Sequence, residues 1–564
     1  MTNKGIARRL KLTADLIELT GGNAFRARAY GSAARTVDRM DEAVLQLVER
    51  DEMTDVQGIG KGIAADITAL VTTGSFETLD ELVETLPPGL LDVLRVKGLG
   101  PKKARALWTG LGVTTLDDLE EMATTGRIAE LDGFGKKSQD TILDNVHQLK
   151  RYRARRRYFD ALGAVAPLMQ ALRTNPAVER AELAGDIRRR LETVATADLV
   201  VVGDADALRV VLAHHAAATD PTDGAFFAGT LPDGLSIRVF HAEADDFARA
   251  WWQRTGSAKH VAAFTERFGE PEAAADEAAI YERHGLAFVE PELREGDGEL
   301  DAAADDALPH LITVGDLRGT LHNHSTYSDG AHTLKQMAEA ARAMGLEYFG
   351  VCDHSRSLQI ANGLSVERLR EQADEVRQLN AAFAADAGPP FRIFHGSECD
   401  ILRDGSLDYP DDVLAELDFV VASIHSHFNM TEDEATERLT RAAEHPHVSI
   451  LGHLTGRLLL SREGYPVDHS RVIAACAAHG VAIEVNANPY RLDIDWRYVR
   501  EATAQGVMIA INPDAHAVDG LKDVQWGVAV ARKGWLTPAQ CLNVKSIDGF
   551  AVWLAARSAA TASA

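Results

Sequence analysis

The chain is short of the features that mark secreted and membrane proteins. Its 564 residues include only four cysteines (Cys352, Cys399, Cys476 and Cys541), and their spacing forms no disulfide framework. No apolar run reaches the ~18 residues that a membrane-spanning helix needs. The opening segment MTNKGIARRLKLTADL also lacks the apolar core of a signal peptide. We therefore expect a reducing, cytoplasmic location and no contact with a membrane.

A surplus of positive charge, the usual mark of a nucleic-acid-binding protein, is also missing. The net charge is -25, but residues 1–200 carry as many basic as acidic side chains, so the negative excess lies in residues 201–564. The first part also contains basic clusters, among them the run from Lys150 to Arg157. Because salt screens charges beyond ~8–10 Å, such clusters can bind phosphates even in an acidic chain. The length and the 46% hydrophobic content predict several domains with cores of their own.

A glycine motif occurs three times in the first 136 residues. Each copy places two glycines around one hydrophobic residue, with a lysine one or two positions later, between segments predicted to be helical. The glycines allow a sharp turn, so that amides at the next helix start can face a phosphate, and the lysine adds attraction without sequence preference. The copies comprise Gly58, Gly60 and Lys61; Gly98, Gly100 and Lys102; and Gly133, Gly135 and Lys136. Three copies strongly resemble the helix-hairpin-helix motif of DNA repair proteins, which implies DNA binding without sequence specificity.

Side chains that can bind metal recur at predicted strand ends in the C-terminal part. His322 and His324 are two residues apart, so in an extended strand they point to one face, and Asp329 follows in a turn. Apolar alternation over residues 311–317 predicts that strand. Later apolar runs end in His354, in Glu398, in His425, in His453, and in Asp514 with His516. Helical segments separate the runs, which predicts a parallel barrel with its site at the carboxyl ends of the strands.

The order of these segments resembles the bacterial family X DNA polymerases that end in a PHP (polymerase and histidinol phosphatase) domain. Residues 184–198 are similar to that family's nucleotidyltransferase palm signature, and Thr255-Gly-Ser-Ala-Lys-His260 is similar to its thumb signature. Pro291-Glu-Leu-Arg-Glu-Gly296, followed by residues 316–322, resembles its linker into the PHP domain. The resemblance covers nearly the whole chain.

The resemblance implies a multidomain α and α/β fold that ends in a distorted (β/α)7 barrel. Residues 1–85 would form a helical domain with the first hairpin, and residues 86–155 a fingers-like helical domain with the other two. Residues 156–240 would form an α+β palm and residues 241–300 a thumb-like domain. A linker over residues 301–315 would lead into the PHP domain, residues 316–564.

The palm signature departs from the family pattern where catalytic carboxylates belong. The family reads Gly-Ser-x-Arg-Arg and later Gly-Asp-x-Asp. Here Asp186 replaces the serine, two residues before Arg188, and Thr196 stands at the first aspartate, so that Asp198 remains. Ser236 replaces the third aspartate. Because two-metal nucleotidyl transfer needs several carboxylates, and neutral hydroxyls are weak ligands by comparison, we expect an inactive polymerase site.

The PHP ligand set, by contrast, is complete. The resemblance implies nine metal ligands, and every position holds the expected residue type: His322, His324, Asp329, His354, Glu398, His425, His453, Asp514 and His516. This mixture of imidazoles and carboxylates suits Mn²⁺, Zn²⁺ or Fe²⁺, and its size fits three divalent ions with Glu398 as a bridge. Arg457 is a candidate for holding a substrate phosphate, with a structural ion pair as an equal alternative.

Three functions stay open on the sequence. The first is a DNA repair enzyme whose PHP centre hydrolyses phosphodiesters, as a 3′–5′ exonuclease or in 3′-end and abasic-site processing. The second is an active family X polymerase with exonuclease activity, which would need substitute palm ligands such as Asp186 or Asp204. The third is a scaffold that binds DNA ends and carries a PHP phosphatase for a small phosphoester. The expected partner is DNA with gaps, nicks or 3′ ends, and the expected state is a monomer.

Overall fold

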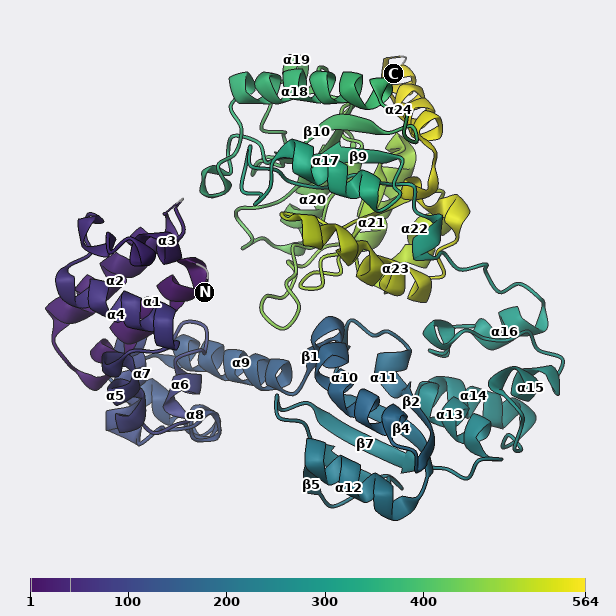
Figure 1. The fold of residues 1–564 in the computed structure, drawn as a ribbon, viewed down its shortest axis with the longest axis horizontal. Helices are drawn as coiled ribbons and strands as arrows, with labels where there is room; N and C mark the ends of the chain where they lie inside the picture. The colour runs from purple at the N-terminus through teal and green to yellow at the C-terminus, as the bar shows by residue number, and fades with distance from the viewer. Residues whose placement is uncertain (2, 41, 563–564) are drawn as a thin grey trace. The chain divides into compact units, whose positions relative to one another are not determined.

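Helices build the first part of the chain. The computed structural model describes residues 1, 3–40 and 42–562, which divide into two compact units, Met1–Ala154 and Arg155–Ala564. The first unit contains α1 (Asn3–Thr20), α2 (Ala24–Asp38), α3 (Val44–Glu49), α4 (Lys61–Thr73), α5 (Glu77–Thr85), α6 (Leu90–Val93), α7 (Pro101–Leu111), α8 (Leu116–Thr124) and α9 (Lys136–Arg153) (Figure 1). The 3-10 helices η1 (Met53–Asp55) and η2 (Arg127–Glu130) lie among them. A single apolar core, which includes Leu10, Val37, Ile67 and Leu107, packs these helices together.

Each of the three glycine motifs forms the turn before a helix. Gly58, Gly98 and Gly133 have φ of 89°, 86° and 85°, a region that favours glycine. The hydrophobic residue between the glycines points inward, as Ile59 and Leu99 show at 4% and 5% exposure. The second glycines are the N-caps of α4, α7 and α9 and bring no capping side chain. The first amides of these helices therefore lack the partner that a serine or aspartate cap would supply.

The palm is an α+β layer at the start of the second unit. Its five-stranded sheet has the order β2 (Val178–Ala184), β4 (Thr196–Gly203), β7 (Ser236–His241), β6 (Phe227–Thr230), β5 (Ala217–Thr219). Helices α10 (Tyr158–Thr174), α11 (Gly185–Arg188) and α12 (Ala205–His215) accompany it, and β1 (Arg156–Arg157) pairs with β3 (Thr193–Val194). Strands β4 and β7 run parallel, with Thr196 opposite Ser236 and Asp198 opposite Arg238.

A helical segment follows the palm and corresponds to the expected thumb. It contains α13 (Phe247–Thr255), α14 (Ala258–Phe268), α15 (Glu277–Glu282), η3 (Pro291–Leu293) and α16 (Glu299–Ala304). His260 is fully buried within it, where its ring nitrogens contact Glu299 at 2.5 Å and Tyr281 at 2.9 Å. This histidine of the thumb signature therefore serves the core of the segment.

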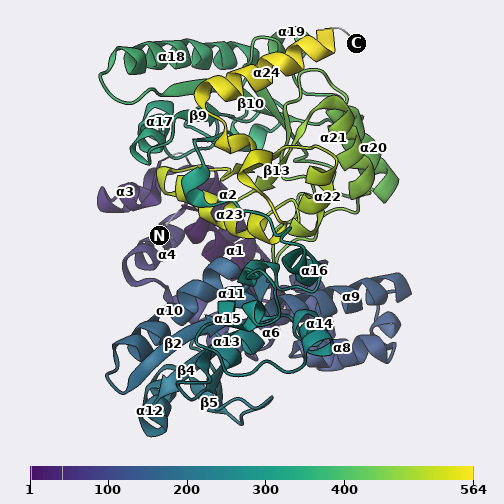
Figure 2. The same cartoon turned by 90° about the vertical axis from the view of Figure 1, so that its right-hand side faces the viewer.

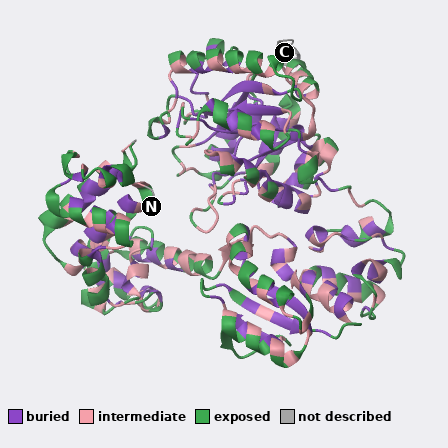
Figure 3. Cartoon of the chain, viewed as in Figure 1, coloured by how far each residue is buried: buried purple, intermediate pink, exposed green. Residues whose placement is uncertain are grey.

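The last part of the chain is a nearly closed barrel of seven parallel strands in chain order. The strands are β8 (Gly319–Thr320), β9 (Tyr348–Val351), β10 (Arg392–Asp400), β11 (Phe419–Ser423), β12 (Ile450–Leu451), β13 (Ala482–Asn486) and β14 (Ile509–Asn512). The helices around them include α17 (Leu334–Ala343), α18 (Val366–Ala385), α19 (Asp411–Leu414), α20 (Glu432–Ala443), α21 (His469–His479), α22 (Val499–Ala504), α23 (Val524–Lys533) and α24 (Ile547–Ala562) (Figures 1 and 2). The strands are buried, as parallel strands covered by helices should be (Figure 3).

The two ends of this barrel are closed differently. At the strand starts, Phe550 of α24 packs against Tyr348, Phe394 and Phe419. At the strand ends, an isolated bridge between Asn323 and Ala515 joins the segments that follow β8 and β14. The apolar plug at one end leaves the carboxyl ends of the strands to polar side chains, the end at which barrel enzymes carry their sites.

Palm and barrel touch within the second unit. Trp526, in α23, packs edge-on against Tyr158 and Phe159 of the palm at ring distances of 5.8 and 5.3 Å. The buried Lys533 lies 2.5 Å from Glu295, whose carboxylate also lies 3.0 Å from palm residue Arg189. The predicted linker motif Pro291–Gly296 thus connects the two parts through ion pairs.

The predicted fold class is confirmed, with one local difference. The strand expected before His322 is shorter than predicted, because residues 314–316 form the 3-10 helix η4 and β8 contains two residues. None of the helices in the described ranges is both long enough and apolar enough to cross a membrane.

Candidate functional site

Nine side chains meet at the carboxyl ends of the barrel strands. His322, His324 and Asp329 follow β8, His354 follows β9, and Glu398 lies near the end of β10. His425, His453, Asp514 and His516 follow β11, β12 and β14. Eight of them fall into three overlapping groups whose ligand atoms lie within 4.8 Å of one another: His324, Asp329, His354 and His516; His322, His324 and Asp514; and His354, Glu398 and His425.

Glu398 is the centre of this cluster. Its side chain is 1% exposed, and its two oxygens face imidazole nitrogens on several sides. The distances are 2.8 Å to His354, 2.9 Å to His453, 3.1 Å to His425, 3.3 Å to His322 and 3.6 Å to His324. A carboxylate in this position can bridge cations, and His453, which belongs to none of the three groups, joins the cluster through it.

Several polar atoms of the cluster are buried and make no hydrogen bond to the described residues, although oppositely charged groups lie near them. Examples are Nε2 of His322, both ring nitrogens of His324 and Oε2 of Glu398. Buried polar atoms are nearly always hydrogen-bonded, since an unpaired one costs about 1–3 kcal/mol. His453 and Asp514 also have positive φ, 21° and 53°, and such strain concentrates at functional sites. The donor set therefore fits bound divalent metal ions.

A ring of carboxylates and amides orients the imidazoles from behind. Nδ1 of His322 lies 2.8 Å from Glu484 in β13, and Nδ1 of His425 contacts Asp400. Glu484 also accepts hydrogen bonds from the His453 amide at 2.8 Å and from Asn512 at 3.0 Å. Such contacts fix the tautomer and direction of a metal-binding histidine.

Asp353, which follows β9 beside His354, holds a turn of the main chain in place and makes no hydrogen bond to an imidazole in the part of the chain that the structure describes. It accepts hydrogen bonds from the amide and hydroxyl of Ser325 at 2.8 and 2.6 Å and from Gln372 at 2.5 Å. It is fully buried and braces the turn between His324 and Asp329.

The carboxylates and imidazoles of the cluster shift one another's pKa values. Burial alone would raise the pKa of Glu398, but the charges of His425, His322 and His354 hold it well below its ordinary value. Burial would lower the pKa of His425, yet Glu398 and Asp400 raise it to about 10. Burial and the neighbouring imidazoles of His516 and His354 lower the pKa of His324 to about 3. Ionised carboxylates and neutral imidazoles are the forms that bind metal, so Glu398 and His324 are in that form, whereas His425 must release its proton to bind a cation.

Two arginines are candidates for holding a substrate phosphate, and the structure distinguishes them. Arg457, the phosphate-binding candidate of the sequence, donates from Nε to the carbonyl of Arg491 at 3.0 Å, from Nη1 to Asp495 at 2.8 Å and from Nη2 to the carbonyl of Leu492. Arg491 instead places Nε 3.4 Å from Oδ2 of Asp514.

The palm contains a pocket with a volume of about 620 Å³. Asp198 is neutralised there by Arg238, whose Nε and Nη2 donate to its two oxygens at 2.8 and 2.9 Å. Burial raises the pKa of Asp198, although Arg238 opposes the shift. Asp186 lies 2.6 Å from Arg189. The parallel pairing sets Thr196 beside Ser236, so hydroxyls occupy neighbouring positions on the two strands.

Other residues of the palm signature hold parts of the fold together. Arg188 donates to Thr255 at 2.7 Å and to Glu277 at 2.8 Å. Glu192 accepts hydrogen bonds from Trp496 and Arg497 of the barrel, both at 3.2 Å.

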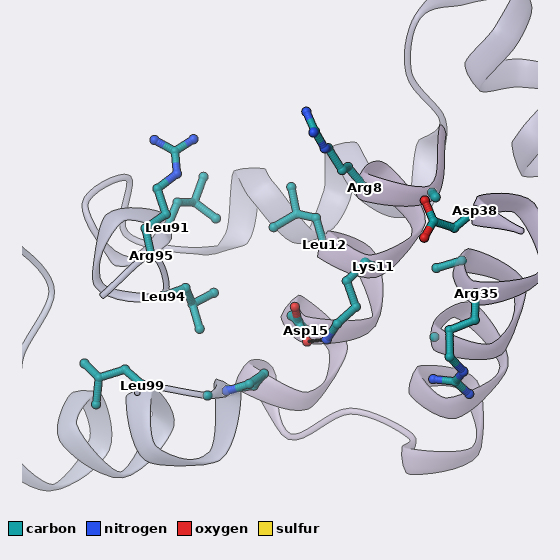
Figure 4. Close-up of a pocket in the computed structure, with 15 residues that line it drawn as sticks. Arg8, Lys11, Leu12, Asp15, Arg35, Asp38, Leu91, Leu94, Arg95 and Leu99 are labelled. Carbon is teal, nitrogen blue, oxygen red and sulfur yellow. Dashed lines mark hydrogen bonds and ion pairs between the residues drawn. The ribbon is translucent and has the colours of Figure 1, made fainter. Parts of the chain in front are cut away.

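The hairpins offer open backbone to a ligand. A side-chain carbon built on Gly60, Gly100 or Gly135 would meet no atom within 4 Å, and Lys61, Lys102 and Lys136 are exposed. Gly100 also borders a groove of about 710 Å³ between α1 and the second hairpin. Basic side chains, among them Arg8 and Arg35, line it together with Leu12, Leu94 and Leu99 (Figure 4).

Three family models match the chain. A helix-hairpin-helix domain matches residues 1–76, a SAM-like helix-hairpin-helix tandem residues 90–146, and a PHP domain residues 320–488. The chain is therefore a multidomain protein that combines helix-hairpin-helix domains with a PHP domain, whose barrel clusters side chains that could bind metal.

Similar proteins place the chain within that class. It is 35% identical over 586 residues to the DNA polymerase/3'-5' exonuclease PolX of Bacillus subtilis (strain 168), an alignment covering 98% of this chain and 99% of that protein. A probable phosphatase of Acetivibrio thermocellus is 28% identical over 204 residues, 35% of this chain and 78% of that protein. A probable phosphatase of Thermoanaerobacter sp. (strain X514) is 26% identical over 237 residues, which cover 39% of this chain and 88% of that protein. The chain belongs to the PolX family, the bacterial family X DNA polymerases with a C-terminal PHP domain.

Proposed function

We propose that this protein is a DNA repair enzyme that hydrolyses phosphodiesters at DNA 3′ ends in its PHP centre and does not polymerise. The observation that carries the proposal is the convergence of the nine predicted ligands. Eight fall into the three groups, His453 joins them through Glu398, and several buried ring nitrogens have no hydrogen-bond partner among the described residues. The name of the Bacillus subtilis relative, which includes a 3'-5' exonuclease, supports the same activity.

The centre would hold three divalent ions, one for each of the three groups of ligands. When bound, such ions lower the pKa of water toward neutrality and offset the charge of phosphate oxygens. The mixed donor set favours Mn²⁺, Zn²⁺ or Fe²⁺. Glu398 keeps the imidazoles around one centre, while Glu484 fixes the ring of His322 and Asp400 fixes the ring of His425.

The palm would be silent because the carboxylates of its signature are paired with arginines. Asp198 is bound on both oxygens by Arg238, and Asp186 is paired with Arg189. Thr196 and Ser236 add no charge. A pair of Mg²⁺ ions about 3.5–4 Å apart needs several ionised oxygens as ligands, and forming such a site here would require breaking these ion pairs.

The first unit would bind the DNA backbone. Uncapped helix starts at Gly60, Gly100 and Gly135 present amides to a phosphate. The following lysines add attraction that is independent of base sequence. Gapped, nicked or 3′-ended DNA and a monomeric state stay predictions of the sequence.

The test combines cleavage and extension in one reaction. A gapped duplex with a labelled strand is incubated with protein, Mn²⁺ and deoxynucleoside triphosphates. We expect shortened products, lost in the variants His322→Ala and Asp514→Asn while DNA binding is kept. Lengthened products would show an active palm.

A second candidate function is a phosphatase for a small phosphoester on a DNA-binding scaffold. The likeness of the barrel to proteins named probable phosphatases favours it. It predicts that metal-loaded protein binds DNA, leaves the phosphodiesters intact and releases phosphate from a monoester such as p-nitrophenyl phosphate.

A further inference from the structure

We infer that Arg491 is the residue that binds the substrate phosphate at the metal centre, and that the palm has become the support that positions it through Glu192. The inference rests on the proposed phosphoesterase function. It gives a role to the palm, which would have none if it does not polymerise.

Arg491 combines proximity to the centre with free hydrogen-bonding capacity. It follows β13, and its Nε lies 3.4 Å from Oδ2 of the ligand Asp514. The side chain is 19% exposed, so the guanidinium is sheltered but open to a ligand. Among the described residues, neither Nη1 nor Nη2 of Arg491 has a hydrogen-bond partner. Two parallel N–H donors match two oxygens of a phosphate.

Arg457 differs from its neighbour because all three of its nitrogens are used. They bind the carbonyls of Arg491 and Leu492 and the carboxylate of Asp495. Leu492 has a φ of 45°, a conformation that costs about 1 kcal/mol or more in a residue with a side chain. Arg457 thus fixes the main chain on which Arg491 stands and acts as its positioning residue.

The palm fixes the same loop from the other side. Asp495 lies 2.8 Å from Arg497, and Arg497 and Trp496 both donate to Glu192 at 3.2 Å. At the other end of the loop, the guanidinium of palm residue Arg157 lies 3.9 Å from the ring centre of Tyr490. Glu192 is only 14% exposed. The loop of residues 488–497 is therefore held between the palm and the metal centre, with Arg491 next to the ligands.

A phosphodiester at the centre would place a non-bridging oxygen against the free edge of Arg491. The guanidinium would neutralise charge that grows on the phosphate during attack, where preorganised donors contribute most to rate. Lysine cannot reproduce the two parallel donors.

The first experiment measures phosphate binding and cleavage in full-length protein loaded with Mn²⁺. In Arg491→Gln, we expect kcat/KM on a 3′-labelled oligonucleotide to fall about 100-fold, within the range for losing one such donor. Competitive inhibition by inorganic phosphate should be lost, while the Mn²⁺ content per chain stays unchanged. Arg491→Lys should recover part of the rate. Wild-type inhibition by phosphate in Arg491→Gln, or loss of its Mn²⁺, would overturn the assignment.

The second experiment tests the palm's part. Glu192→Ala should lower kcat/KM about 3- to 10-fold without changing the Mn²⁺ content. The matched control is Glu182→Ala, another palm glutamate in an ion pair, 2.9 Å from Arg173, and it should leave the rate unchanged. In the Arg491→Gln background, Glu192→Ala should cause no further loss, because coupled residues are not additive. Equal losses in both backgrounds would refute the positioning role.

These outcomes separate the inference from the proposed function. If wild-type protein does not cleave DNA, the proposed function fails. The affinity of the Mn²⁺-loaded protein for inorganic phosphate, measured by calorimetry with and without Arg491→Gln, still decides whether Arg491 binds phosphate. Equal affinity in both proteins would refute it.

Discussion

The charge of Glu398 should determine whether metal ions stabilise the protein. The variant Glu398→Gln keeps the shape of the side chain but removes the negative charge that five imidazoles face, at 2.8 to 3.6 Å. Because Glu398 is 1% exposed, water cannot reach the site to compensate for the lost negative charge. We expect the variant to lose most of its affinity for divalent cations.

The size of the effect follows from linkage. A ligand at 100 times its Kd stabilises the folded state by about 2.7 kcal/mol. The second unit, Arg155–Ala564, has roughly 410 residues and an unfolding entropy of about 0.86 kcal/mol/K at ~2.1 cal/mol/K per residue. Loading with Mn²⁺ should therefore raise Tm by about 3 °C in the wild type and by less than about 1 °C in Glu398→Gln.

The assay is thermal unfolding of each protein with Mn²⁺ and with a chelator. The difference between the two conditions is the readout, since it cancels any effect of the substitution on the metal-free fold. Glu416→Gln is the control, because Glu416 lies in the same barrel and pairs with Arg370 at 2.7 Å with a side chain 45% exposed. It should keep the wild-type increment. A wild-type increment in Glu398→Gln would refute the reasoning.

Three further predictions concern other parts of the chain. Gly100→Ala should leave Tm unchanged, because its φ of -81° suits any residue, but it should weaken DNA binding several-fold in a gel-shift titration. Gly98 has a φ of 86°, so Gly98→Ala should instead destabilise the first unit by about 1 kcal/mol. Burial lowers the pKa of His395 to about 4. Between pH 6.5 and 4 the unfolded chain is protonated at this histidine and the folded chain is not, so the free energy of unfolding decreases as the pH is lowered through that range. The loss from pH 7 to 5, measured by urea unfolding, should be about 2 kcal/mol smaller in His395→Gln. Glu277→Gln should cost about 3–5 kcal/mol in the same assay, because it leaves Arg294, with a side chain that is 0% exposed, without its 2.6 Å carboxylate partner.

The clustering of the nine candidate ligands could be predicted because they carry a local signal. Each follows or ends an apolar strand, and parallel strands must end at one edge of the barrel. Two supporting carboxylates were missed for different reasons. Glu484 lies inside the apolar run Val481–Val485, where a lone charge was its only signal. Asp400 lies two residues after Glu398 in the same strand, a spacing that puts both on one face and could have revealed it.

The roles of Arg457 and Arg491 could not be separated from sequence. Both follow a strand end by a few residues, and both are arginines near predicted ligands. What distinguishes them is which carbonyls and carboxylates surround each guanidinium, and those come from the loop 488–497 and from Asp514. The closure of the barrel by Asn323 and Ala515 is likewise a contact between distant segments.

Incubation of wild-type protein and Asp514→Asn with Mn²⁺, deoxynucleoside triphosphates and an end-labelled gapped duplex tests the central claim most directly. The account predicts that wild-type protein only shortens the labelled strand and that Asp514→Asn leaves it intact. Lengthening by wild-type protein, or shortening that persists in Asp514→Asn, would contradict it.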